Sequence, residues 1–182
     1  MNPILYRAFT MVIPYTRLLS SSVSCHMLEP PVKTPCIGVC STGIGDSVCR
    51  GCKRFSHEVI DWNSYTPEQK SIIDQRLSGF LSQCVSNKLR VTDKALLKWQ
   101  LEIQNVRYVQ HHDEYCWVFS LLKAGAGQID SSGDFGFEVD LRYRDIPLAD
   151  LREQIDEEYL ILSQAHYDRY IATPDLFTRG QV

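Results

Sequence analysis

Three stretches in the C-terminal half of the chain have the residue patterns of β-strands. Apolar side chains recur at every second position of the first stretch, at Ala95, Leu97, Trp99, Leu101 and Ile103. The third stretch has the same period, at Phe135, Phe137, Val139, Leu141 and Tyr143. The second stretch, residues 115–122, is apolar on both faces. With a period of two, every second side chain points toward the core. These stretches therefore predict a three-stranded antiparallel sheet.

A helical spacing follows the third stretch. Positions three or four residues apart form one mainly apolar face, at Leu148, Leu151, Ile155, Tyr159, Leu162, His166 and Tyr170. This spacing predicts a long amphipathic C-terminal helix. Together with the strands it predicts an α+β domain over residues 90–172, with the helix on one face of the sheet, followed by a tail at residues 173–182.

The residues before this domain are predicted to be helical. Ser56 can cap a short helix over residues 57–62. A longer helix has a clear start, because Thr66 suits the N-cap, Pro67 the first helical position and Gln69 a capping box. Its predicted apolar face is Ile72, Ile73, Leu77, Phe80, Leu81 and Cys84. A linker is predicted at residues 86–88.

Four cysteines near the start of this helical part carry the strongest chemical signal. Cys36 and Cys40 form a C-x3-C pair, and after eight residues Cys49 and Cys52 form a C-x2-C pair. Two close pairs of thiolates can converge on one metal centre, so these four residues are the predicted metal ligands. Disulfides and free structural thiols are the alternatives, but the chain has an odd number of cysteines, 7.

The spacing leaves the metal open between Zn²⁺ and an iron–sulfur cluster. Four cysteines in a closed site are a common zinc arrangement. Iron–sulfur clusters also take four cysteines, although the ferredoxin spacings differ from this one. Arg50, Lys53 and Arg54 crowd the second pair and would offset the negative charge of a tetrathiolate site with either metal.

These residues resemble a family of short bacterial proteins. The resemblance rests on residues 35–40, on Cys49-Arg50-Gly51-Cys52-Lys53-Arg54, on residues 58–62, which end in Trp62, and on residues 66–69. The family is a four-cysteine domain of unknown function, often labelled a predicted Fe–S protein, and the similarity covers about residues 33–82. It implies an iron–sulfur centre as strongly as zinc, and it implies no activity.

Composition limits the partners of the protein. The 182 residues are 44% hydrophobic and 23% charged, which is typical of a soluble globular protein. Residues 88–182 carry 11 Lys and Arg against 16 Asp and Glu, and this acidic balance argues against nucleic acid as a partner. No apolar run reaches the roughly 20 residues that span a membrane. A cytoplasmic location is therefore expected.

The first 26 residues differ in composition from the rest. They contain two arginines, no acidic residue and a run of three serines, which resembles an organellar transit peptide. They also resemble upstream sequence translated from a start codon assigned too early, and Met27 would then be the true start. Residues 1–30 are accordingly expected to be an arm that precedes a cysteine module at residues 31–84.

The remaining candidate residues have structural interpretations. Cys84 and Cys116 lie on predicted apolar faces and are expected to be buried. The run His111-His112-Asp113-Glu114 could bind a metal, but its place between two predicted strands favours a polar turn. His166 is expected to be semi-buried and hydrogen-bonded. No catalytic constellation is recognisable, so the sequence leaves enzymatic activity uncertain.

The sequence therefore predicts a metal-binding accessory or interaction protein with a protein partner. The alternative is a redox component that carries an iron–sulfur cluster within an oxidoreductase system.

Overall fold

The computed structural model describes residues 32–172. The predicted N-terminal arm and C-terminal tail lie outside the described residues, as does the proposed start at Met27. The longer helices are α2 (Pro67–Ser86), α3 (Lys94–Ile103), α4 (Glu114–Gly125) and α5 (Leu148–Tyr167). The shorter elements are η1 (Thr42–Ile44), α1 (Ser56–Ile60), β1 (Leu89–Val91), η2 (Ala126–Gln128), η3 (Ser132–Phe135), β2 (Phe137–Val139), η4 (Leu141–Tyr143) and η5 (Asp168–Ala172).

The α+β class is confirmed, but the predicted three-stranded sheet is wrong. The described residues form a two-stranded antiparallel sheet in which β1 pairs with β2. In its register, Leu89 faces Val139 and Val91 faces Phe137. Leu89 and Phe137 are buried, so this small sheet contributes one face to the core.

The first predicted strand is the helix α3. Asp93 caps it, because the Asp93 side chain accepts hydrogen bonds from the backbone N–H groups of Ala95 and Leu96, both at 2.9 Å. Leu97 and Leu101 are the buried residues of this helix. A spacing of four fits a helix as well as a strand, which explains the wrong prediction.

The second predicted strand is the helix α4. Asp113 caps this helix by accepting a hydrogen bond from the backbone N–H of Cys116 at 3.0 Å. Both faces of the stretch are apolar because the helix is buried on most sides. Its buried residues are Cys116, Trp117, Val118, Phe119, Leu121 and Leu122. The expected burial of Cys116 is confirmed, although in a helix.

Only the middle of the third predicted strand is extended. Gly136 precedes β2 with φ +76°, a conformation that L-residues rarely adopt. A Cβ on Gly136 would lie 2.3 Å from the Asp93 carbonyl oxygen. After β2, the Asp140 side chain accepts a hydrogen bond from the backbone N–H of Arg142 at 3.0 Å and starts η4. A left-handed glycine and a capping aspartate therefore limit the strand to Phe137–Val139.

The two long helices are confirmed. Thr66 and Gln69 form the predicted capping box at the start of α2, with Pro67 at its first position. Ile73, Leu77 and Cys84 are buried on this helix as expected, whereas Ile72 is exposed. Along α5 the buried apolar residues are Leu151, Ile155 and Tyr159. At α1, Phe55 occupies the N-cap position, and the predicted cap Ser56 is the first helical residue.

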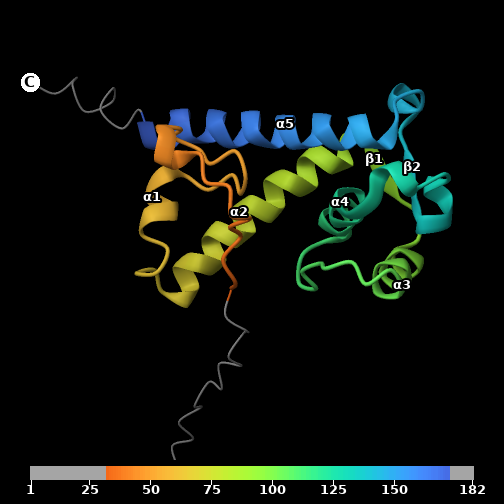
Figure 1. Cartoon of the computed structure of the whole chain (residues 1–182), viewed down its shortest axis with the longest axis horizontal. Coiled ribbons are helices and arrows are strands. Elements are labelled where there is room, and N and C mark those ends of the chain that lie inside the picture. Colours follow the sequence, from red (N-terminus) through yellow and green to blue (C-terminus); the bar gives the residue numbers. More distant parts are fainter. Residues whose placement is uncertain (1–31, 173–182) are drawn as a thin grey trace, which may run out of the picture. The chain divides into compact units, whose positions relative to one another are not determined.

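One hydrophobic core joins most of these elements. It runs from Trp62 and the buried face of α2 through Leu89 to α3, α4 and α5. In Figure 1, α2 runs obliquely to α5 and meets it toward the C-terminal end of α2, and α4 packs against both. The core thus crosses the boundary predicted between residues 84 and 90. The division into a cysteine module at residues 31–84 and an α+β domain at residues 90–172 stays a prediction.

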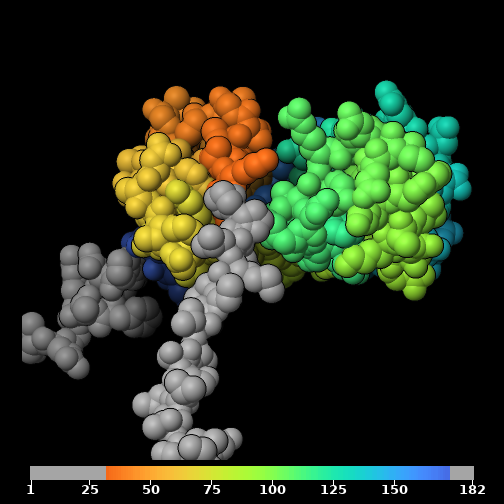
Figure 2. All heavy atoms as spheres, turned by 90° about the horizontal axis from the view of Figure 1, so that it is seen from below, coloured from red at the N-terminus to blue at the C-terminus, as the bar shows by residue number. Residues whose placement is uncertain are grey.

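The cysteine-bearing segment lies at one end of this arrangement. In Figure 2 its residues (orange) gather against α1 and the start of α2 (yellow), while α3 and α4 (green) form the other part of that face. Within residues 32–172, no helix is long and apolar enough to cross a membrane.

Candidate metal centre

The second cysteine pair lies in a tight turn. Val48 and Phe55 form an antiparallel bridge, and the backbone N–H of Cys49 donates to the Arg54 carbonyl at 2.8 Å. At the end of the turn, Lys53 has φ +58°, an uncommon value for a residue other than glycine. Within this turn the side chains of Cys49 and Cys52 lie within hydrogen-bonding reach of each other.

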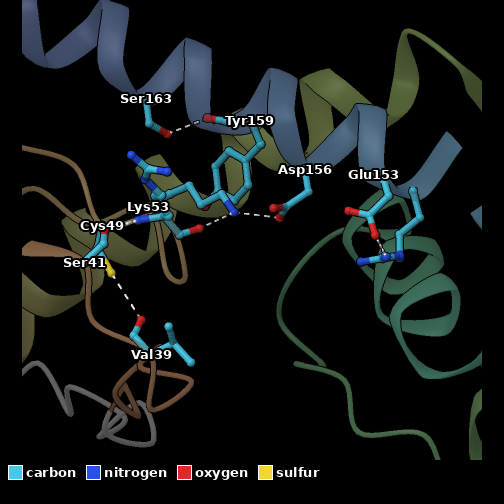
Figure 3. A network of polar contacts seen from close by, with 10 residues as sticks. Val39, Ser41, Cys49, Lys53, Glu153, Asp156, Tyr159 and Ser163 are labelled. Carbon is cyan, nitrogen blue, oxygen red and sulfur yellow. Dashed lines mark hydrogen bonds and ion pairs between the residues drawn. The ribbon is translucent and has the colours of Figure 1, made fainter. Parts of the chain in front are cut away.

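The loop with the first cysteine pair passes against this turn. A Cβ on Gly51 would lie 2.7 Å from the Val39 carbonyl oxygen, so only glycine permits the approach without movement. The Cys49 thiol also contacts this carbonyl oxygen, at 3.7 Å (Figure 3). In addition, the backbone N–H of Arg50 donates to the Ser41 hydroxyl at 2.9 Å. These contacts hold the two predicted ligand segments side by side.

The two cysteine pairs differ in exposure. Cys49 and Cys52 are buried, whereas Cys36 and Cys40 are exposed. All four are free thiols in the structure. Among residues 32–172, no three of these sulfur atoms come within 4.8 Å of one another. Ligation of one metal by all four cysteines stays a prediction.

Backbone donors stabilise a thiolate at Cys49. Burial acts to raise the pKa of this thiol, but hydrogen bonds from the backbone N–H groups of Cys52, Ser41 and Gly51 outweigh it and lower the pKa to about 7. At Cys52 burial is the largest effect and raises the pKa, although Arg54 opposes it. Because thiolates are the form that binds metal, the turn prepares Cys49 for ligation.

Two buried cations lie directly after the second pair. Lys53 is 1% exposed, and its ammonium donates to the Arg50 carbonyl at 2.7 Å and to Asp156 of α5 at 2.6 Å (Figure 3). Arg54 is 2% exposed and stacks over the Trp62 ring at 4.6 Å. Of the three cations expected around the second pair, Lys53 and Arg54 are thus buried, whereas Arg50 is exposed.

Arg54 differs from Lys53 in its partner. The Arg54 Nε donates to the Cys52 sulfur at 3.4 Å, and its Nη1 is buried without a hydrogen-bond partner. Among the described residues, no carboxylate forms an ion pair with Arg54. The group that accepts a hydrogen bond from the Arg54 guanidinium is the Cys52 sulfur.

A buried ion pair fixes the exit of the turn. Glu58 of α1 accepts a hydrogen bond from the backbone N–H of Phe55 at 2.9 Å and pairs with Arg76 of α2 at 2.6 Å. Arg76 in turn lies over the Phe55 ring at 3.8 Å. The cysteine turn is thereby attached to α2, and through Lys53 to α5.

The other two cysteines of the described part differ chemically. Burial raises the pKa of Cys84 to about 11, and burial also raises the pKa of Cys116. Both are therefore neutral at physiological pH, in agreement with their prediction as buried apolar side chains.

The comparisons with known proteins agree with the cysteine pattern. Residues 34–80 match the model of a family described as "Protein of unknown function (DUF1289)". The match includes all four predicted ligands and ends within α2, close to the range expected from the sequence resemblance. No curated protein and no solved structure matches the chain.

Two histidines that the sequence analysis assigns to a polar turn belong to a second group of metal-ligand atoms. Asp74 of α2 lies beside His111 and His112, and one ligand atom of each falls within 4.8 Å of the other two. The adjacent histidines were the available signal, but the predicted strands around them favoured a simple turn. Asp74 gave no signal, because its proximity to residues 37 and 38 positions away depends on the packing of α2 and α4.

His166 is semi-buried as expected. Its ring lies between those of Phe55, Phe80 and Tyr170. The hydrogen bond expected for it is not made by Nδ1, which is buried without a partner.

Proposed function

We propose that this protein is a metal-binding accessory or interaction protein whose centre is held by Cys36, Cys40, Cys49 and Cys52. The observation that carries the proposal is the buried Arg54. A buried guanidinium is costly unless a negative group compensates it, and its Nε is directed at the Cys52 sulfur. A metal-bound thiolate supplies the lasting negative charge that a neutral thiol lacks.

The charge of the whole centre supports the same proposal. Four thiolates carry four negative charges, so a divalent zinc site of this type retains a charge of about −2. Cationic and N–H donors around the sulfurs offset that charge and orient the ligands. Arg54 and the backbone N–H groups around Cys49 provide both functions.

Zn²⁺ and an iron–sulfur cluster both fit this donor set. The first gives a structural centre that organises a surface for a protein partner, and the thiols then require a reducing compartment such as the cytoplasm. The second makes the protein an electron carrier within an oxidoreductase system. The exposure of Cys36 and Cys40 supports the electron-carrier alternative, because a redox partner can approach a cluster with ligands at the surface.

Elemental analysis of protein purified without oxygen tests the proposal and separates its two forms. A colourless protein with one zinc supports the structural centre, whereas a brown protein with iron and sulfide supports electron transfer. Replacing any one of the four cysteines by Ser should lower the metal content, while Cys84→Ser and Cys116→Ser should retain it. Full metal content in any of the four variants would contradict the four-thiolate centre.

Arg54 provides a sharper test, because it is not a ligand. Arg54→Gln should weaken metal binding by about 10- to 100-fold in competition with a chelator. Arg50→Gln is the matched control, since Arg50 lies in the same turn but is exposed and pairs with Asp46. Equal metal affinities of the two variants would show that Arg54 stabilises only the fold.

A further inference from the structure

A second set of ligand atoms lies outside the cysteine segment. The Nε2 atom of His112 lies 2.8 Å from Asp74 Oδ2, and the Nε2 atom of His111 lies 2.9 Å from the same oxygen. The two imidazole rings are nearly perpendicular, at 81°, with their centroids 4.7 Å apart. Asp74 and His112 are mostly buried, while His111 faces solvent.

The ligand atoms of Asp74, His111 and His112 meet at one place, since each lies within 4.8 Å of the other two. Both histidines direct Nε2 at Asp74 Oδ2. Two imidazole nitrogens and one carboxylate oxygen around a common point are a frequent donor set of zinc sites with an open position.

The backbone around the histidines is fixed by contacts that do not involve their rings. The Trp117 indole N–H donates to the Val109 carbonyl at 2.9 Å, which holds the turn before α4. Asp113, directly after His112, caps α4. The Cys116 thiol donates to the Ser78 carbonyl at 3.4 Å, one helical turn after Asp74 on α2. The histidines and the aspartate are therefore held together by the packing of α4 on α2.

We infer that Asp74, His111 and His112 form a second metal site, which takes Zn²⁺ and is separate from the cysteine centre. Ligands at about 2.0–2.1 Å from a tetrahedral Zn²⁺ lie about 3.3 Å apart. The present separations of 2.8 and 2.9 Å need to widen by about 0.5 Å. The exposed His111 ring can provide this at its own contact, and the contact of His112 needs a small rotation of the His112 or Asp74 side chain. Three protein ligands leave the fourth position to water.

One of the three proposed ligands borders a cavity. His112 lines a cavity of about 550 Å³ together with Trp117, Tyr108 and Arg107. A site with three protein ligands and an open position has the form of reactive zinc sites, whereas structural sites are closed by four. The inference does not depend on the cysteine centre, since none of its residues belongs to the segment of residues 36–52.

Zinc titration of the full-length protein, with its cysteine centre as purified, tests the inference. In competition with a chromophoric chelator at neutral pH, the wild-type protein should bind one equivalent of Zn²⁺ more than His111→Ala or Asp74→Asn. Alternatively, the variants should bind this equivalent at least about tenfold more weakly. His57→Ala is the matched control and should bind like the wild type, because His57 lies on α1.

Nitrogen NMR of labelled histidines identifies the ligand atoms directly. Addition of Zn²⁺ should shift the Nε2 signals of His111 and His112 and leave that of His57 unchanged. If Asp74→Asn does not fold, His111→Ala decides, because the His111 side chain is 60% exposed. Unshifted histidine signals, or equal zinc uptake by the wild type and His111→Ala, would overturn the inference.

Discussion

The ammonium of Lys53 lies 2.6 Å from the carboxylate of Asp156. Lys53 follows Cys52 in the cysteine turn, and Asp156 lies on the C-terminal helix α5. The lysine side chain is 2% exposed and the aspartate 39%. The buried Lys53 ammonium is thus compensated by the partly exposed Asp156. This ion pair attaches the predicted metal centre to the C-terminal helix α5.

Asp156→Ala should destabilise the protein. The variant leaves the buried Lys53 ammonium with the Arg50 carbonyl as its hydrogen-bond acceptor and with the Tyr159 ring at 5.5 Å, and such a loss costs about 1–3 kcal/mol. Because water reaches Asp156, the lower part of this range is expected. Glu157→Ala, at an exposed neighbouring position of α5, should change the free energy of unfolding by less than about 0.5 kcal/mol. Urea denaturation measures both, and equal stabilities would mean that the pair contributes nothing.

Gly51→Ala should disturb the approach of the two cysteine segments. Its Cβ would lie 2.7 Å from the Val39 carbonyl oxygen and 3.0 Å from Ile37 Cγ1, so the loop must move. Overpacking of this kind costs about 1–3 kcal/mol. Gly43→Ala is the matched control, since a Cβ there meets nothing within 4 Å. The melting temperature and the metal content should both fall for Gly51→Ala and stay unchanged for Gly43→Ala. If Gly51→Ala has the melting temperature and metal content of the wild type, the loop moves without cost.

The stability of the protein should decrease below about pH 6.5 in part through His166. Burial, and then the nearby charge of Arg76, lower the pKa of this side chain from its ordinary value of 6.5. Between the folded pKa and 6.5 the unfolded chain therefore binds more protons, and the free energy of unfolding falls as the pH is lowered. Above pH 6.5 His166 is neutral in the folded and in the unfolded chain, and this loss of stability is absent.

His166→Phe should remove this dependence. Phenylalanine fits the ring cluster of Phe55, Phe80 and Tyr170 and also removes the unpaired Nδ1. Chemical denaturation at several pH values measures the slope of stability for the wild type and the variant. The same slope in both proteins would assign the acid sensitivity to other groups.

Removal of the metal should act first on the cysteine segment. The sequence predicts that residues 31–84 depend on metal and that residues 90–172 do not. Because α2 packs on α4 and α5, we expect chelation to remove amide-exchange protection from residues 32–66 and to leave α2, α4 and α5 protected. Uniform loss of protection would instead show that the metal supports the shared core.

The sequence predicts the long helices and the cysteine cluster because their signals are local. The cap formed by Thr66 and Gln69 and the spacing of α5 need no knowledge of tertiary contacts. The strand errors arise where a local pattern has two interpretations. Leu97 and Leu101 fit both periods, and the apolar stretch of α4 fits a buried strand as well as a buried helix. Asp93 and Asp113 mark both helix starts, and these caps were the overlooked signal.

The contacts around the candidate sites cannot be predicted from the sequence. Lys53 meets Asp156 across 103 residues, and Asp74 meets His112 across 38. Neither partner can be chosen in advance from charge alone, because the chain carries 22 acidic residues. Packing of helices selects the pairs.

The separation of Lys53 from Asp156 also sets an order of events during synthesis. At about 5–20 residues per second, a ribosome needs about 5–20 s to translate the 103 residues between them. Throughout this interval the cysteine turn is already synthesised, but the part of α5 that carries Asp156 is not. The emerging thiols thus encounter the metal and redox conditions of the compartment before their final attachment exists.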